Sequence, residues 1–215
     1  HMIRTLGGVG ILCSLLIVLT FQWTLPAIER NKAEALERAI FHVLPGATER
    51  ATFEISDAGG VTPFAGKPTG DRQLIYVGYD DQGQLVGVAI EAAGQGFQDI
   101  IRLLYGYSPE RQQVVGMEVL ESKETPGLGD KIIKDARFVA NFSALDVSLD
   151  AAGKALQHTV VAVKNGKKTS PWEIDGITGA TISSVAVAAI IDASASSTLP
   201  TVQRQLDSLR KESTP

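Results

Sequence analysis

The chain contains little of the two residue types that hold most protein-bound transition metals. Of its 215 residues one is a cysteine, Cys13, and three are histidines. A single cysteine excludes an intrachain disulfide, a cysteine-rich zinc site and an iron–sulfur cluster held by this chain alone. The histidines form no cluster in the sequence. Any redox chemistry carried out by this chain must therefore use another kind of cofactor.

The sequence also lacks an excess of positive charge. It has 20 Lys and Arg residues against 24 Asp and Glu residues, a formal net charge of -4, and basic residues alternate with acidic ones, as in Glu37-Arg38 and Asp130-Lys131. Binding to a nucleic-acid backbone needs a basic patch. We therefore expect a solvated surface of mixed charge and no nucleic-acid partner.

Charged side chains are missing between Thr5 and Ile28, where the sequence is mostly apolar. As a helix, this run would be about 36 Å long, which is enough to cross the apolar core of a bilayer with some tilt. Trp23 fits an aromatic residue at the membrane interface, and Pro26 predicts a break in the helix soon after Trp23. The alternative is a cleaved secretory signal, but the run is longer than a usual signal core and no clear cleavage site follows it. We expect a retained transmembrane helix within residues 1–28.

The rest of the chain divides into three expected parts. Residues 29–46 have apolar side chains at helical spacing and predict an amphipathic juxtamembrane helix, which ends at Pro45-Gly46. Residues 47–198 are expected to form the main domain. Residues 199–215 predict a weaker amphipathic helix, a C-terminal tail prone to fraying.

Within the main domain, β-rich segments alternate with turn-forming clusters. Two pairs of such segments predict β-hairpins, 73–79 with 84–92 and 100–107 with 113–121. A third hairpin is predicted around Asn165-Gly166, because this dipeptide supplies the positive φ values of a tight primed turn.

Helical patterns are interspersed with these hairpins. One or two short helices are expected over 130–142, and a mostly buried helix is expected after Thr181, where nearly all side chains are apolar or small. Hairpins with interspersed helices and no βαβ alternation predict an α+β fold. We expect a mainly antiparallel sheet with flanking helices.

Three glycine-containing loops, at 94–97, 124–130 and 175–184, are the candidates for chemistry. The last is the most informative, because it combines small residues with the hydroxyls of Thr178 and Thr181 and leads into an apolar helix. Exposed backbone amides at the positive end of a helix are typical of an anion site. The alternative is that Thr181 merely caps the helix and the glycines serve the turn.

Two other catalytic patterns are missing from the sequence. Gly166-Lys167-Lys168 lacks the upstream glycine and the following Ser or Thr of a nucleotide-binding P-loop. A G-x-S-x-G nucleophile elbow does not occur, and no histidine is evidently placed to support a serine.

The segment Thr178-Gly179-Ala180-Thr181, preceded by Asp175-Gly176, resembles the flavinylation motif of FMN-binding domains. The similarity extends to the D-x-x-G-x-L-x-G-x-A-I pattern that begins at Asp80, to Gly94-x-Gly96-Phe97 and to the K-E-T-P-G-L-G run that begins at Lys123. With the N-terminal apolar run, these motifs cover most of the chain and resemble the G subunit of the Rnf electron-transport complex. The related C subunit of the sodium-pumping NADH:quinone reductase is usually longer, so size and the E-T-P-G-L-G-D-K run favour the Rnf family.

The resemblance implies that Thr181 carries FMN covalently, through a phosphoester. It also implies that a separate flavin transferase, which uses FAD and magnesium, reads the surrounding motif. The further cofactor-binding residues implied in this region are Asp175, Gly176, Thr178, Gly179, Ala180 and Ser184. Serine is common in the family at Thr178, and this chain retains the hydroxyl.

A second segment is implied to line the flavin ring. Its residues are Glu124, Thr125, Leu128 and Gly129, and the alternative is a structural turn, because Pro-Gly favours a turn by itself. The role of Ser122, where related sequences often have histidine, is left open. The resemblance implies no catalytic side chain and no metal site in this chain.

The function implied by the resemblance is electron relay in a membrane complex. FMN would be the carrier, and the complex would couple electron transfer between ferredoxin and NAD to ion movement, with other membrane subunits as partners. The family places the soluble domain on the periplasmic side of the inner membrane, although the basic residues that flank the apolar run would favour the cytoplasm. Two alternatives stay open: a stand-alone extracytoplasmic flavoprotein reductase, and a membrane-tethered binding or assembly module in which Thr181 is only a helix cap.

Overall fold

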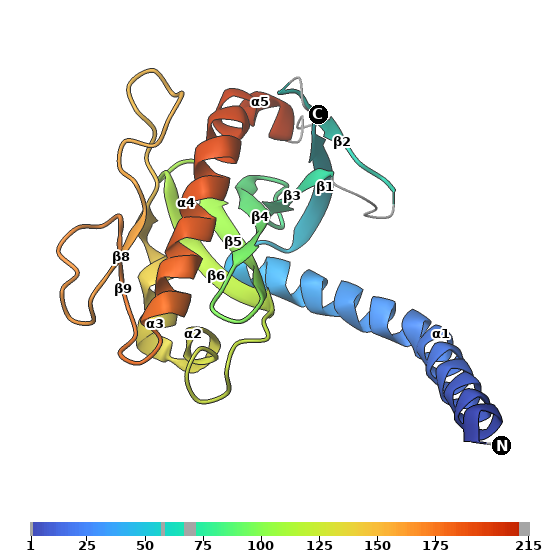
Figure 1. Ribbon diagram of the computed structural model, residues 1–215. Coiled ribbons are helices and arrows are strands. Elements are labelled where there is room, and N and C mark those ends of the chain that lie inside the picture. Colours follow the sequence, from blue (N-terminus) through green and yellow to red (C-terminus); the bar gives the residue numbers. More distant parts are fainter. Residues whose placement is uncertain (1, 57–58, 67–71, 211–215) are drawn as a thin grey trace. The chain divides into compact units, whose positions relative to one another are not determined.

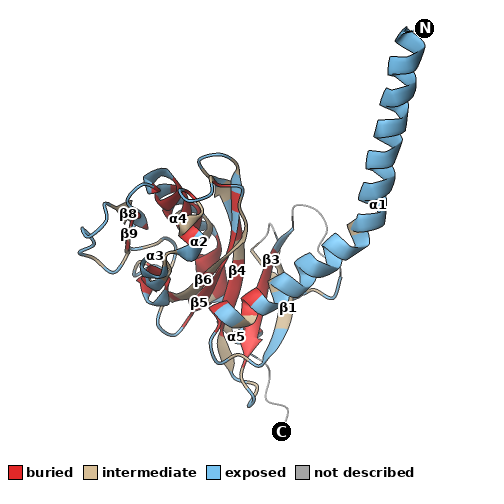
Figure 2. Ribbon diagram, turned by 90° about the horizontal axis from the view of Figure 1, so that it is seen from below, coloured by how far each residue is buried: buried red, intermediate tan, exposed pale blue. Residues whose placement is uncertain are grey.

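The computed structural model describes residues 2–56, 59–66 and 72–210 and contains two compact units, His1–Arg38 and Ala39–Pro215. The first unit is the N-terminal part of helix α1 (Met2–Val43), which is coloured blue in Figure 1. This helix is long and apolar enough to cross a membrane, and its apolar window is fully exposed, as its pale blue colour in Figure 2 shows. Its length and apolar surface are those expected of a membrane anchor.

Helix α1 continues through Pro26. The predicted break at this residue is therefore wrong, and the helix ends only at the turn that contains Gly46, whose φ is +99°. Proline removes one backbone donor and crowds the preceding turn. A long helix can absorb this as a local kink, and the alanine-, glutamate- and leucine-rich sequence after Pro26 has a strong helical preference.

The second unit is built on a seven-stranded sheet with the order β2-β1-β3-β4-β5-β6-β7, in which all neighbours are antiparallel (Figure 1). The strands are β1 (Glu49–Ile55), β2 (Val61–Pro63), β3 (Gln73–Tyr79), β4 (Leu85–Gln95), β5 (Ile100–Ser108), β6 (Gln113–Glu121) and β7 (Leu145–Asp146). The predicted hairpins correspond to β3–β4 and β5–β6, and they and the α+β class are confirmed. Strands β1, β2 and β7 are additions that the sequence patterns do not predict.

Helix α4 (Thr181–Arg204) packs across one face of the sheet and is coloured orange to red in Figure 1. Val187 and Ile191 of this helix share one apolar core with Val88 and Ile90 of β4. The helix is also tied to the sheet by hydrogen bonds. Two of these involve buried tyrosines: Tyr107 Oη donates to Gln203 Oε1 at 3.0 Å, and the Tyr105 and Ser194 hydroxyls are 3.0 Å apart. A third tyrosine, Tyr79, donates from Oη to the carbonyl of Leu209, which follows this helix in the chain, at 2.6 Å.

Helix α4 passes through Pro200 and is followed by the short helix α5 (Leu206–Leu209). The sequence predicts that the domain ends at residue 198 and that 199–215 form a frayed tail. That boundary is wrong, because Leu199, Val202 and Leu209 have no exposed surface. The apolar face of this segment packs into the same core as the rest of α4. Residues 211–215 of the predicted tail lie outside the described residues.

The opposite face of the sheet receives the last turn of α1, which belongs to the second unit. Gly106 of β5 makes room for it, because a Cβ at this position would lie 2.0 Å from the carbonyl oxygen of Val43. Gly87 of β4 does the same for Leu44, whose Cδ2 would be 2.9 Å from a Cβ there. Only glycine permits this close approach. The buried residues of the last turn are Ala39, Ile40, Val43 and Leu44.

Strands β8 (Val161–Val163) and β9 (Glu173–Asp175) form a separate two-stranded sheet that is parallel. The predicted antiparallel hairpin is therefore wrong. Gly166 has a φ of +73°, but Asn165 does not have the positive φ that a type I′ turn requires. The connection is instead folded by carboxylates, since the side chains of Glu173 and Asp175 accept hydrogen bonds from four of its backbone amides.

The short helices predicted over 130–142 are confirmed. They are α2 (Lys131–Lys134), α3 (Ala136–Ala140) and a 3₁₀ turn (Asn141–Ser143). Asp135 separates the first two and caps α3, because its side chain accepts hydrogen bonds from the first backbone amides of that helix.

Candidate functional site

The loop that carries the Thr-Gly-Ala-Thr segment joins β9 to the first turn of α4. Gly179 has a φ of +85°, a conformation that favours glycine. Thr178 and Gly179 are exposed, whereas Ala180 is 5% exposed and packs into the domain. Of these two implied cofactor-binding residues, Gly179 therefore lies on the surface and Ala180 anchors the loop.

Thr181 is the first residue of helix α4, and Ala180 occupies the N-cap position. The interpretation of Thr181 as a helix cap is therefore wrong. The Thr181 side chain is exposed, and its hydroxyl makes no hydrogen bond within residues 2–56, 59–66 and 72–210. The backbone amides of a first helical turn have no partner within the helix and lie at its positive end. An available hydroxyl thus stands beside a set of anion-binding donors.

The next two hydroxyls of α4 are buried, and the protein itself uses both. Ser184 Oγ accepts the N–H of Ile177 at 3.1 Å and donates to the carbonyl of Ala180 at 2.9 Å. Ser183 Oγ donates to Glu124 Oε2 at 2.5 Å. The structure therefore places Ser184 beneath the loop, where it fixes the loop's shape.

Glu124 lies at the centre of the site and is only 6% exposed. Its Oε1 accepts the backbone amides of Phe97 at 2.8 Å and Gln98 at 3.1 Å, while Oε2 accepts the Ser183 hydroxyl. A buried carboxylate is tolerated when its oxygens are satisfied in this way. Glu124 therefore joins the loop after β4, the loop after β6 and the start of α4, which the sequence singles out as three separate segments.

Two glycines of these segments leave the space that Glu124 occupies. A Cβ on Gly129 would lie 2.4 Å from Glu124 Oε2 and 3.0 Å from Ser183 Oγ, and a Cβ on Gly96 would lie 2.5 Å from Glu124 Oε1. The sequence predicts that Gly129 lines a flavin ring, but it is buried against Glu124. Sequence reasoning missed Ser183 as the partner of Glu124, because a buried hydroxyl and an exposed one look alike in a sequence.

Asp175 and Gly176 support the loop from below. The Asp175 carboxylate accepts the amides of Gly166 at 2.6 Å and Lys167 at 3.3 Å, and its backbone N–H donates to Asn141 Oδ1 at 3.0 Å. Gly176 is buried, and a Cβ there would lie 2.7 Å from the carbonyl oxygen of a neighbouring strand residue. These two motif residues thus shape the loop from the domain side.

The segment that contains Thr125 and Leu128 forms a turn beside this loop. The backbone amide of Leu128 donates to the carbonyl of Thr125 at 3.1 Å, so the turn alternative is confirmed for the backbone. The Leu128 side chain is 51% exposed, and Thr125 is half-buried. Ser122, whose role the sequence leaves open, accepts the amide of Glu124 at 3.2 Å and so stabilises the start of the turn.

Lys131 follows this turn and reaches the Thr-Gly-Ala-Thr loop. A Cβ on Gly179 would lie 3.9 Å from Lys131 Nζ. Sequence reasoning missed this residue, because a lysine beside an aspartate is usually part of a solvated surface. Its position directly after the glycine-containing segment 124–130 is the feature of the sequence that could have pointed to it.

Large apolar side chains are exposed around the start of α4 and on the two loops that Glu124 joins to it. They are Phe97, Leu128, Ile182 and Val185, each at least half exposed. Phe97 also lines an open hollow of about 490 Å³ together with Gln98, Asp99 and Lys123. Exposed apolar side chains from three neighbouring segments make this part of the surface a candidate place for a ligand or another protein to bind.

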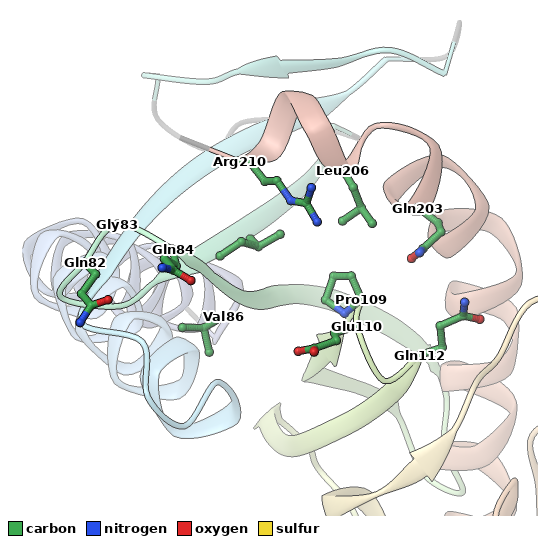
Figure 3. Close-up of a pocket in the computed structure, with 11 residues that line it drawn as sticks. Gln82, Gly83, Gln84, Val86, Pro109, Glu110, Gln112, Gln203, Leu206 and Arg210 are labelled. Atoms are coloured by element: carbon green, nitrogen blue, oxygen red, sulfur yellow. The ribbon is translucent and has the colours of Figure 1, made fainter. Parts of the chain in front are cut away.

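A second hollow, of about 700 Å³, lies elsewhere on the domain (Figure 3). Its lining residues come from the β3–β4 and β5–β6 turns and from the C-terminal end of the chain: Gln82, Gly83, Gln84, Leu85, Val86, Pro109, Glu110, Gln112, Gln203, Leu206 and Arg210. Gln203 is separated from Thr181 by almost the whole of α4, about 33 Å at 1.5 Å per residue. This hollow is therefore separate from the candidate site.

Comparison with known proteins identifies the family. The FMN-binding domain matches residues 96–196, which include Glu124, Lys131 and Thr181. The G subunit of the ion-translocating oxidoreductase complex of Methanosarcina acetivorans is 33% identical over 185 residues, 86% of each chain. This chain belongs to that G-subunit family. The G subunit of the Na(+)-translocating ferredoxin:NAD(+) oxidoreductase complex of Acetobacterium woodii is 29% identical over 80% of this chain and 77% of that one.

Solved structures show that the fold of this chain occurs in other proteins. NqrC from Shewanella oneidensis has a TM-score of 0.64 at 18% identity, covering 84% of this chain and 98% of that chain. The C subunit of the Na(+)-translocating NADH-quinone reductase from Parabacteroides distasonis has a TM-score of 0.61 at 18% identity, covering 87% and 98%. The fold of this chain and the NqrC fold are therefore alike.

Proposed function

We propose that this chain carries FMN covalently, through a phosphoester between the flavin phosphate and Thr181 Oγ1. The observation that carries the proposal is the contrast among the hydroxyls that begin α4. Ser183 and Ser184 are buried and hydrogen bonded, whereas the Thr181 hydroxyl is exposed and available. The surroundings fit the group, because first-turn amides suit a phosphate and exposed apolar side chains suit a flavin ring.

The flavin would be added by a transferase that uses FAD and magnesium. In that reaction the bond from Thr181 Oγ1 to the flavin phosphate forms, the diphosphate of FAD breaks, AMP leaves and the hydroxyl proton is released. The surface position of Gly179 and Thr181 supports access by a second protein without unfolding of the domain. Asp175, Gly176 and Ser184 hold that surface in shape.

The test is in-gel flavin fluorescence after denaturing electrophoresis. Wild type, Thr181→Val and Thr178→Val are each expressed with and without a flavin transferase, and the labelled peptide is mapped by mass spectrometry. We expect a fluorescent band for wild type only with the transferase, and none for Thr181→Val. Thr178→Val removes the other threonine hydroxyl of the same loop. Because Thr178 also belongs to the motif that the transferase reads, the mapped peptide, and not the loss of a band in this variant, decides which hydroxyl carries the flavin.

Two results would contradict the proposal. Covalent flavin on Thr181→Val would place the attachment at another residue. A colourless wild type, under conditions in which the transferase labels a control substrate, would exclude covalent FMN and favour a binding or assembly module.

As an electron carrier, the bound FMN would supply one- and two-electron chemistry, while the protein holds and orients it. We propose that this chain works in an Rnf-type complex that couples electron transfer between ferredoxin and NAD to ion movement, together with other membrane subunits. Family membership and the apolar helix α1 support this proposal. Purification in mild detergent tests it: co-migration with several membrane subunits is expected, and a solitary flavoprotein would favour a stand-alone reductase.

We further propose that the soluble domain lies on the periplasmic side of the inner membrane. Lys167 is exposed and distant in sequence from the membrane helix, so a cysteine at this position reports the side. Lys167→Cys in a Cys13→Ser background should react with an impermeant maleimide in intact spheroplasts. Labelling only after lysis would place the domain in the cytoplasm.

A further inference from the structure

Lys131 stands at the edge of the Thr181 loop. It is the first residue of α2, is half-buried, and has its Nζ 3.9 Å from the position that a Cβ would take on Gly179. In the part of the chain that the structure describes, Lys131 Nζ takes part in no hydrogen bond or ion pair. Gly179 precedes Thr181 by two residues, so this ammonium group lies beside the backbone that carries the available hydroxyl.

The nearby carboxylates are bound by other groups. Asp130 accepts Lys134 Nζ at 2.5 Å and the amide of Gly127 at 2.7 Å, and the hydrogen bond from Lys134 lowers the Asp130 pKa. Glu124 accepts two backbone amides and the Ser183 hydroxyl. No carboxylate among the described residues therefore forms an ion pair with Lys131.

Resting on the proposed phosphoester at Thr181, we propose that Lys131 is a positioning residue that binds the phosphate of the attached FMN. A phosphodiester carries one negative charge, and a lysine ammonium supplies a point charge and up to three donors for it. Charge-assisted hydrogen bonds of this kind are stronger than neutral ones. The first-turn amides of α4 would bind the same phosphate from the helix side.

The consequence is a restricted direction for the flavin. A phosphate bound only through Thr181 rotates about the side-chain bonds of that residue. A phosphate also bound by Lys131 is held between the turn after β6 and the start of α4, so the flavin leaves the loop along one path. Lys131 would thus limit the motion of the flavin through its phosphate, without contacting the ring.

The test compares Lys131→Gln with Lys134→Gln in the full-length, detergent-purified protein, co-expressed with a flavin transferase. Lys134→Gln is the matched control and is made together with Asp130→Asn, because this removes the lysine at the other end of α2 with its partner. The asparagine keeps an acceptor for the Gly127 amide and leaves no free carboxylate beside Lys131. The readouts are the fluorescence anisotropy of the covalent flavin and the ³¹P chemical shift of the phosphodiester. We expect Lys131→Gln to lower the anisotropy and to move the ³¹P resonance toward its value in the urea-unfolded protein, and Lys134→Gln to leave both unchanged.

The outcomes separate the two proposals. If wild type carries no covalent flavin, the proposed function falls and this inference falls with it. If wild type is loaded and Lys131→Gln matches it in both readouts, only the role of Lys131 is overturned. If Lys131→Gln carries no covalent flavin, Lys131→Arg is tested next. Covalent flavin on Lys131→Arg, with Lys134→Gln flavinylated normally, supports a cation at the phosphate. Lys131→Arg without covalent flavin overturns the role of Lys131.

Discussion

Replacement of Glu124 by alanine is the sharpest test of how the site is held together. The substitution removes the acceptor for the amides of Phe97 and Gln98 and for the Ser183 hydroxyl. The hydroxyl can rotate toward another acceptor, but the two amides are fixed by the backbone. An unsatisfied donor costs about 1–3 kcal/mol when it is fully buried. Because these two hydrogen bonds are only partly buried, Glu124→Ala should lower the free energy of unfolding by roughly 1–3 kcal/mol.

The measurement is urea unfolding of the detergent-solubilised protein, followed by circular dichroism. Glu110→Ala is the control, because Glu110 is an exposed glutamate in the β5–β6 turn, and its replacement should change the free energy of unfolding by less than about 0.5 kcal/mol. Glu124→Gln keeps the shape and one acceptor oxygen and should cost less than alanine. If Glu124→Ala and Glu110→Ala unfold at the same urea concentration, the carboxylate does not hold the three segments together.

Three further predictions test neighbouring features. Gly129→Ala puts a Cβ 2.4 Å from Glu124 Oε2 and should destabilise the domain by about 1–3 kcal/mol in thermal unfolding, as overpacking does; an unchanged midpoint would contradict it. Ser184→Ala removes the acceptor of the Ile177 amide, so hydrogen exchange at that amide should become faster, and unaltered exchange would show that water replaces the serine. Burial raises the pKa of all four tyrosines, Tyr76, Tyr79, Tyr105 and Tyr107. In the unfolded chain a tyrosine has a pKa of about 10. The stabilisation from the buried neutral tyrosines is therefore complete below about pH 10 and is lost as the pH rises through their higher pKa values in the folded protein. Tyrosinate absorbance should therefore appear together with unfolding, and its appearance in the folded protein near pH 10 would refute this.

The sheet could be predicted largely from the sequence, because its hairpins depend on local patterns. Strands β3 to β6 combine β-branched and aromatic residues with short polar turns, and hairpin pairing follows from such neighbours. The connection after β8 could not, because its course depends on Glu173 and Asp175 binding backbone amides of the loop. Asn165-Gly166 predicts a hairpin only when no such competing acceptor is close.

The site shows the same division between local and tertiary information. The Thr-Gly-Ala-Thr segment and its position before an apolar helix can be read from the sequence, because they are contiguous. The roles of Glu124 and Ser183 cannot, since these residues are 59 positions apart and meet only when α4 packs on the sheet. Pro26 misleads for a related reason: a proline disfavours a helix locally, while the residues around it can still keep the helix continuous.

The shortness of the two outermost strands has a consequence for solubility. An open sheet edge offers unpaired amides and carbonyls to the edge of another molecule, and natural sheets limit this with short strands, proline or charge. Here the edges are β2, three residues that end in Pro63, and β7, two residues that end in Asp146. A chain tethered by α1 would meet its copies at a raised effective concentration in the plane of a membrane. Its short edge strands would allow many copies to lie close together there without pairing through the edges of their sheets.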